Sequence, residues 1–229
     1  MSNSKGSFIS ARVVMISMKS DEKRSSRWPL ILVGFVLVFL FVIIPLIFSI
    51  IGERNTGNVA LIPIEGVIMT SGGSSFGQSF VGSDEIVHYI EQANENPSIQ
   101  AIVLEINSPG GSAVASDEIA TAVRKANKPV ITVIREAGAS GGYWIASSTD
   151  YIIANKMSIT GSIGVISSYL EFSGLMEKYG VEYERLVAGD RKDIGTPLRD
   201  MNNEERQILQ KKLDRIHEFF IEEVARNRN

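Results

Sequence analysis

Hydrophobic and polar positions divide the chain into three parts. Residues 29–51 contain no charged side chain, and as a helix they would extend roughly 34 Å, enough to cross a bilayer core of about 30 Å. Residues 1–28 are polar and mixed in charge, and residues 52–229 have the composition of a globular domain. This pattern predicts a tail, a transmembrane anchor and one folded domain.

Basic residues set the expected orientation of the anchor. Four of them stand directly before the apolar run, namely Lys19, Lys23, Arg24 and Arg27. Only Arg54 stands directly after it, so the positive-inside rule predicts a cytoplasmic tail and an extracytoplasmic domain on a single-pass protein of the cell membrane. A cleaved signal peptide is the alternative, but its apolar region is normally shorter and no Ala-x-Ala site follows Ile51. We therefore expect the anchor to be retained.

In the domain, apolar runs alternate with helical patterns. Strands are predicted over 59–69, 99–106, 129–134, 151–154 and 181–187, with a bend at Gly66 in the first. Helices are predicted from a cap at Ser83, over 116–127, through Trp144, and over 202–228. Turns rich in Gly and Ser follow most of the strands. Strand, glycine turn and helix in repeated order predict an α/β fold with a parallel sheet of buried strands.

Composition narrows the chemistry. The chain has no cysteine, which excludes thiol nucleophiles, thiolate zinc sites and disulfides. It has two histidines, His88 and His217, and no His-Glu-x-x-His motif, so we expect no metal site and no cofactor. Residues 1–28 hold six Lys/Arg and two Asp/Glu, whereas the remainder holds 17 and 24. An acidic domain argues against a nucleic-acid partner.

One serine stands in a setting suited to nucleophilic attack. The string Gly138-Ala-Ser-Gly-Gly142 follows a predicted strand and matches G-x-S-x-G, the nucleophile elbow. Such a turn exposes the hydroxyl of Ser140, and the next N–H, that of Gly141, is free to face an oxyanion. The alternative is an ordinary glycine turn or helix cap.

A serine nucleophile needs a base. Both histidines lie in predicted helices, so a Ser-His-Asp triad has little support. The next option is a lysine kept neutral by desolvation, and Lys156 and Lys192 are the two that follow strands in loops. Lys192 lies in the glycine-marked loop 188–197, where a solvated loop lysine is the plain alternative.

A second glycine turn follows the strand that ends at Ile106. Its sequence is Asn107-Ser-Pro-Gly-Gly111, and adjacent amides in such a turn form an anion hole when they face the same point. A simple strand-to-helix connection is the alternative.

Four motifs in order resemble a known family. INSPGGS at 106–112, AGASGGYWIAS at 137–147, TGSIGV at 160–165 and AGDRKDIGTP at 188–197 resemble signal peptide peptidase A (SppA), the short membrane-anchored type of Ser/Lys protease. The resemblance covers roughly residues 58–229 and implies a ClpP/crotonase-type fold.

The resemblance also implies roles for individual residues. Ser140 matches the nucleophile, Lys192 the general base, and Ser162 the hydroxyl that holds the lysine. Three glycines match or adjoin the oxyanion hole: Gly110, Gly111 and Gly141. Because the base must be deprotonated, a neutral-to-alkaline activity profile is expected.

The family further implies a homo-oligomer that cleaves remnant signal peptides or similar apolar peptides, with active sites near subunit contacts. The resemblance leaves open whether Ser140 and Lys192 meet within one subunit or across two. Family members usually continue with a further segment after the long helix, whereas this chain ends at Asn229; a truncated C-terminal end is therefore one interpretation. Rival functions are a Ser/Lys protease that clips a membrane partner, a non-catalytic scaffold, and a crotonase-type acyl-CoA enzyme.

Overall fold

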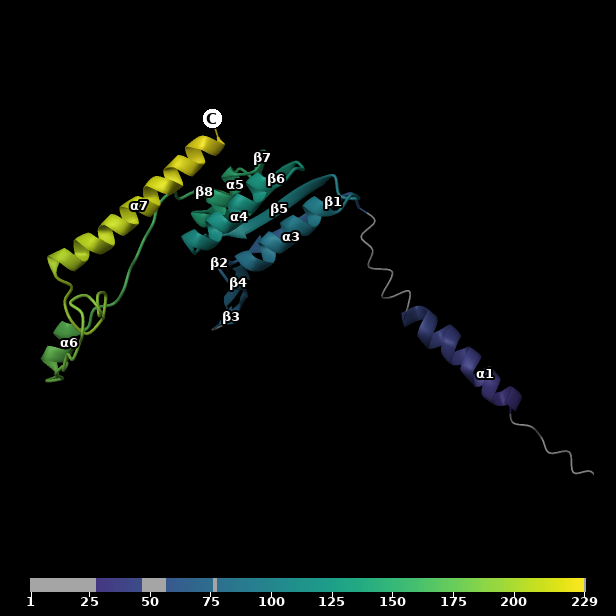
Figure 1. Cartoon of the computed structure of the whole chain (residues 1–229), viewed down its shortest axis with the longest axis horizontal. Coiled ribbons are helices and arrows are strands. Elements are labelled where there is room, and N and C mark those ends of the chain that lie inside the picture. Colours follow the sequence, from purple (N-terminus) through teal and green to yellow (C-terminus); the bar gives the residue numbers. More distant parts are fainter. Residues whose placement is uncertain (1–27, 47–56, 76–77, 229) are drawn as a thin grey trace, which may run out of the picture. The chain divides into compact units, whose positions relative to one another are not determined.

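The computed structural model describes residues 28–46, 57–75 and 78–228 (Figure 1). Residues 1–55 and 56–229 form separate units. In the first unit, helix α1 (Trp28–Val38) leads into the π-helix η1 (Phe39–Ile43). No helix of the described residues has the length and apolar character needed to cross a membrane. The predicted tail up to residue 27 and the end of the predicted anchor lie outside the described residues, and both stay predictions.

The second unit is built on a parallel sheet. Its strands are β1 (Val59–Glu65), β5 (Ala101–Ser108), β6 (Val130–Ala139) and β7 (Tyr151–Ala154), in that spatial order, and β8 (Ile159–Gly161) pairs with the end of β6. Every pairing in this sheet is parallel. The predicted α/β class with a parallel sheet is therefore confirmed, and the carboxyl ends of the strands share one edge.

Three helices cover one face of this sheet: α3 (Ser83–Glu95), α4 (Ala113–Lys125) and α5 (Gly141–Ser147). Burial alternates along β5, so Ile102, Leu104 and Ile106 enter the core under these helices. The opposite face remains open in the described residues. On it, Leu61 of β1 is 62% exposed and Ile153 of β7 is 50% exposed, although parallel sheets are usually covered on both faces.

The predicted strand 59–69 is two strands in two sheets. Gly66, with φ +82°, separates β1 from β2 (Val67–Met69), and a Cβ there would lie 2.6 Å from the Ser79 carbonyl oxygen. Strand β2 joins β4 (Gln78–Gly82), which also pairs with β3 (Gly73–Ser75). An isolated bridge from Ile68 to Gly111 then ties the small sheet to the second glycine turn.

Two predicted local features are wrong. Residues 181–187 form no strand, because their backbone has no neighbouring strand in the described residues with which to make a ladder. Ser83 does not cap α3 either: Gly82 holds that position, and the Ser83 hydroxyl donates to Glu118 Oε2 at 2.5 Å instead. The short strand β8 was also absent from the predicted strands.

The chain ends in α6 (Ser173–Lys178) and the long helix α7 (Asn203–Asn227). The helix predicted over 202–228 is confirmed within one residue at each end. It opens with a capping box, in which Asn202 accepts from the Glu205 N–H and Glu205 accepts from the Asn202 N–H. Near its other end, the buried Phe220 ring stacks on Trp144 of α5, with centroids 4.7 Å apart.

Candidate active site

Ser140 sits on a sharp turn between β6 and α5. Its backbone has φ 51° and ψ −122°, a region that side-chain-bearing residues seldom occupy. The turn is held on both sides, because the Ser140 N–H donates to the Gly161 carbonyl at 2.8 Å and the Ser140 carbonyl accepts from Tyr143 and Trp144. This is the strained strand-to-helix geometry of a nucleophile elbow.

The second glycine turn closes against Ser140. A Cβ on Gly110, where φ is +106°, would lie 2.7 Å from the Ser140 Cβ and 2.8 Å from the Gly141 nitrogen. A Cβ on Gly111 would lie 2.0 Å from the Ile68 carbonyl oxygen. Only glycine therefore allows the two turns and the small sheet to approach this closely.

Two backbone N–H groups at this junction are without an acceptor. Gly111 and Gly141 donate to no group among the hydrogen bonds of residues 57–75 and 78–228. The Gly110 N–H, by contrast, donates to the Ser108 hydroxyl at 3.1 Å. A Cβ on Gly141 would lie 3.4 Å from the Gly111 nitrogen, so the two free groups are close neighbours.

Ser162 directly follows strand β8, just as Ser140 directly follows the neighbouring strand β6. Ala139 is in register with Gly161, and Ser162 then also adopts a positive φ, 54°. Because parallel strands end at one edge, both serines lie at the carboxyl edge of the sheet. The structure thus brings Ser140 and Ser162 to the same edge of the sheet.

Both serines line one cavity, of about 720 Å³. Gly111 and Gly141 contribute the backbone of one wall. Apolar side chains supply much of the rest: Trp144, Ile163, Val165, Ile166, Leu213, Ile216 and Phe220. Three of them come from α7, so the long helix forms a wall of the cavity that holds the nucleophile candidate.

Lys192 does not line this cavity. It lies in the loop 188–197 and is exposed. The loop forms successive turns, in one of which the Lys192 N–H donates to the Gly189 carbonyl at 3.1 Å. His88 and His217 lie in α3 and α7, as expected for histidines outside the site.

A cluster of ions holds the Lys192 loop to the start of α7. We call it the Asp193 cluster, comprising Asp193, Arg185, Arg199 and Glu205. Arg185 donates to both Asp193 oxygens at 2.7 and 2.8 Å, and Arg199 donates to both at 3.0 Å. Arg199 also donates to both Glu205 oxygens, at 2.9 and 2.6 Å. The bonds from the two guanidinium groups hold the pKa of Asp193 well below its usual range, and Arg199 likewise lowers the pKa of Glu205.

Helix α7 separates the cluster from the cavity. Glu205, in its first turn, belongs to the cluster, whereas Phe220 lines the cavity and stacks on Trp144. Along the helix axis, Glu205 lies about 12 Å from Leu213, where the cavity wall begins, and about 22 Å from Phe220. Figure 1 shows α6 and the neighbouring loops at the N-terminal end of α7, and α5 near its other end.

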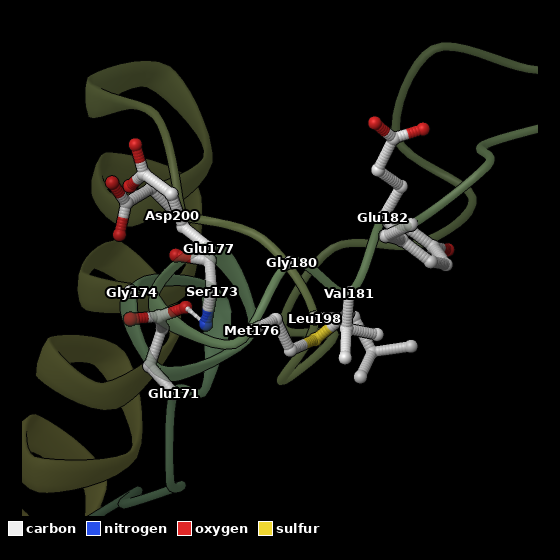
Figure 2. Close-up of a pocket in the computed structure, with 11 residues that line it drawn as sticks. Glu171, Ser173, Gly174, Met176, Glu177, Gly180, Val181, Glu182, Leu198 and Asp200 are labelled. Carbon is white, nitrogen blue, oxygen red and sulfur yellow. Dashed lines mark hydrogen bonds between the residues drawn. The ribbon is translucent and has the colours of Figure 1, made fainter.

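A second cavity, of about 550 Å³, lies beside α6 (Figure 2). Its lining includes four carboxylates, from Glu171, Glu177, Glu182 and Asp200. Hydrogen bonding from the side chain of Ser173 and then from its N–H lowers the pKa of the Glu171 carboxyl. None of the serines or glycines singled out by the sequence lines it, and among the described residues no group of side chains is arranged to bind a metal ion.

Two family models match the chain. The model of peptidase family S49 matches residues 122–229, and the model of the Clp protease matches residues 81–162. Together they cover both glycine turns, both serines and Lys192. The chain belongs to peptidase family S49, the SppA family. Its parallel sheet with the Ser140 elbow agrees with a ClpP-like α/β fold.

Individual relatives agree with this family. A candidate signal peptide peptidase SppA of Enterococcus faecium is 34% identical over 183 residues, which are 77% of this chain and 53% of that protein. Protease 4 of Haemophilus influenzae is 33% identical over 179 residues, 74% of this chain and 28% of that protein. The chain thus spans about half, or less, of the length of these relatives.

A solved structure is also similar. The membrane protease of Pyrococcus horikoshii specific for a stomatin homologue is 25% identical, with a TM-score of 0.37. The alignment covers 45% of this chain and 48% of that one.

Proposed function

We propose that the chain is a serine endopeptidase with Ser140 as nucleophile. The observation that carries the proposal is the Ser140 elbow, strained at φ 51° and flanked by the free N–H groups of Gly111 and Gly141. A strained conformation costs of order 1–3 kcal/mol and persists at functional sites where the surroundings enforce it. Here the strained serine lines a cavity.

The proposed reaction transfers an acyl group to Ser140. Lys192 takes the hydroxyl proton, and the Ser140 oxygen bonds to the carbonyl carbon of a peptide. The carbonyl oxygen becomes an oxyanion, which accepts hydrogen bonds from the N–H groups of Gly111 and Gly141. The C–N bond then breaks, and the lysine proton passes to the leaving amine.

Water completes the cycle. It attacks the ester carbon and gives a proton to Lys192, and the Ser140 oxygen leaves and takes that proton back. Ser162 is proposed to hold the lysine amine through its hydroxyl. In the proposed mechanism Gly110 shapes the oxyanion hole and does not donate to the oxyanion, because its N–H already donates to the Ser108 hydroxyl.

The position of Lys192 favours a dyad built from two copies of the chain. In its own chain Lys192 is exposed and does not line the Ser140 cavity, and its loop is tied to Glu205, about 12 Å along α7 from Leu213, where the cavity wall begins. A neutral lysine base needs desolvation, and a second copy docking its loop at the cavity would provide it. A homo-oligomer is therefore part of the proposal.

The apolar cavity wall favours apolar peptides. Leu213, Ile216 and Phe220 of α7 face the same space as Ser140, and remnant signal peptides have such apolar cores. We include the membrane anchor at 29–51, with an extracytoplasmic domain, in the same proposal, since it would place the peptidase where its substrates are released.

The first test uses the full chain in detergent with a fluorogenic signal-peptide-like substrate. Ser140→Ala and Lys192→Ala are each expected to lower kcat at least about 1000-fold, because each removes a group that acts in the bond-breaking step. Lys156→Ala, which removes an exposed lysine from a different loop, is the matched control and should retain full activity. Retention of activity by Ser140→Ala would refute the proposal.

Mixing the two inactive variants tests where the dyad forms. If Ser140 and Lys192 meet across copies, a mixed oligomer of Ser140→Ala and Lys192→Ala contains some intact sites, and part of the activity returns. If they meet within one chain, the mixture stays inactive at every ratio.

A further inference from the structure

The residues on either side of Lys192 are both tied to the first turn of α7. Arg191 forms an ion pair with Glu204, and Asp193 is joined through Arg199 to Glu205. Lys192 itself takes part in no ion pair among the described residues. The loop is therefore anchored by its charged neighbours, while the lysine between them is left unengaged.

The Asp193 cluster is stronger than ordinary surface ion pairs. Asp193 accepts four hydrogen bonds from two guanidinium groups, in paired bidentate geometry, and its side chain is 16% exposed. Glu205 is only 3% exposed and also accepts from the Asn202 N–H. Isolated exposed pairs contribute little, whereas a bidentate, half-buried network holds its members in one geometry.

Residues 181–202 include no strand and no helix, so hydrogen-bonded ladders do not fix the Lys192 backbone. A general base must nonetheless reach its proton within about 3 Å, and a misplacement of about 1 Å costs up to roughly 100-fold in rate. Backbone turns, including the bond from the Lys192 N–H to the Gly189 carbonyl, set the local shape of the loop. The Asp193 cluster supplies the side-chain bonds that tie this loop to the first turn of α7.

We propose that Asp193 is a positioning residue that fixes Lys192 on the first turn of α7, through Arg185 on one side and Arg199 with Glu205 on the other. This inference rests on the proposed function, since it assumes that Lys192 acts as the base. Asp193 touches no substrate; it acts through the backbone of the residue before it.

The test replaces Asp193 by Asn, which keeps the shape and removes the charge that both guanidinium groups share. In the full chain, Asp193→Asn is expected to lower kcat by about 10- to 100-fold and to leave KM within about twofold, because the cavity wall is unchanged. Asp190→Asn, in the same loop but without an ion pair among the described residues, is the matched control and should match the wild type. Asp193→Glu keeps the charge and should retain most of the activity.

A double variant separates positioning from a general loss of structure. If Asp193 acts through Lys192, adding Asp193→Asn to Lys192→Ala causes no further loss. If the first mixing experiment shows a dyad across copies, mixing Ser140→Ala with Asp193→Asn should also raise the activity. The Ser140→Ala chain then supplies an intact Lys192 loop to the Ser140 of the Asp193→Asn chain. If Asp193→Asn proves unfolded, Arg185→Ala leaves the bonds to Arg199 and Glu205 in place and is expected to lower kcat severalfold.

The outcomes keep the two proposals distinct. An inactive wild type, or full activity in Lys192→Ala, overturns the proposed function and this inference with it. An inactive Lys192→Ala with full activity in Asp193→Asn overturns the positioning role alone. A further loss in the double variant, or a rise in KM without a fall in kcat, also overturns it.

Discussion

Two serines of the described chain adopt a positive φ, and both directly follow strands of the parallel sheet. The turn at Ser140 is enforced from several directions: its N–H is bound to Gly161, and Gly110 leaves no room for a side chain. A non-glycine residue in this conformation stores strain that the fold must offset elsewhere. The hydroxyl therefore has a fixed position before any substrate arrives.

Replacing Ser140 by Gly should make the folded chain more stable. Glycine relieves a strain of order 1–3 kcal/mol, and its greater freedom in the unfolded chain costs about 0.5–1 kcal/mol, so a gain of about 1 kcal/mol is expected. Thermal unfolding should show a Tm higher by roughly 2–4 °C. Ser140→Ala, which keeps the Cβ, should show no comparable gain; a lower Tm for Ser140→Gly would mean that the turn is not strained.

At the scale of elements, helix α7 contacts both the Ser140 cavity and the Lys192 loop. Its C-terminal half carries the apolar stripe that reaches Trp144 and the Ser140 cavity, and its first turn carries Glu204 and Glu205 for the Lys192 loop. The capping box makes Glu205 serve the helix and the Asp193 cluster together. Loss of that carboxylate would disturb both.

Acid should loosen the Lys192 loop before it disturbs the sheet. The pKa values of Asp193 and Glu205 are lowered in the fold by their guanidinium partners. Their stabilising contribution is thus complete above the ordinary carboxyl pKa values of 3.8 and 4.5, and it declines as the pH falls below them. Hydrogen exchange over 189–205, corrected for intrinsic rates, should rise from pH 6 to pH 3. Equal protection at both pH values would contradict the expectation, and Asp193→Asn should weaken the pH dependence.

At the scale of the whole molecule, the proposed dyad makes catalysis a property of an assembly. In one copy Lys192 lies outside the cavity, on a loop tied to α7 about 12 Å from the start of the cavity wall at Leu213, so under this proposal an isolated copy would lack a base at Ser140. The proposal thereby links the activity to association, without any change of fold.

Specific activity should therefore fall on dilution. At concentrations where the full chain in detergent dissociates, the activity is expected to fall together with the fraction of oligomer. For a site built from two copies, the total rate then approaches the square of the protein concentration. Mass photometry at the assay concentrations reports the state of association. Constant specific activity in a sample shown to be monomeric would place the dyad within one chain.

Local patterns predicted much of this fold. The strand at 151–154 and the long helix were found within a residue, because periodicity and capping are written in neighbouring residues. Residues 181–187 look like a strand by composition, but a strand needs a partner that local sequence does not reveal. A shared role for Ser140 and Ser162 comes from the family resemblance and stays a prediction. The location of Lys192 and the Asp193 cluster were not predicted, because ion pairs between separate loops leave no periodic signal.

Helix α7 is one uninterrupted helix, and its length therefore acts as a spacer. Its single run of 25 residues fixes the spacing between a cavity and a loop, and each added turn would lengthen that spacing by about 5.4 Å. Inserting seven residues in its middle would keep the stripe on nearly the same side, since seven residues make almost two turns. If the dyad forms across copies, as proposed, the lengthened chain would hold Lys192 at a different distance from the Ser140 cavity, and its mixture with the original chain should lose activity.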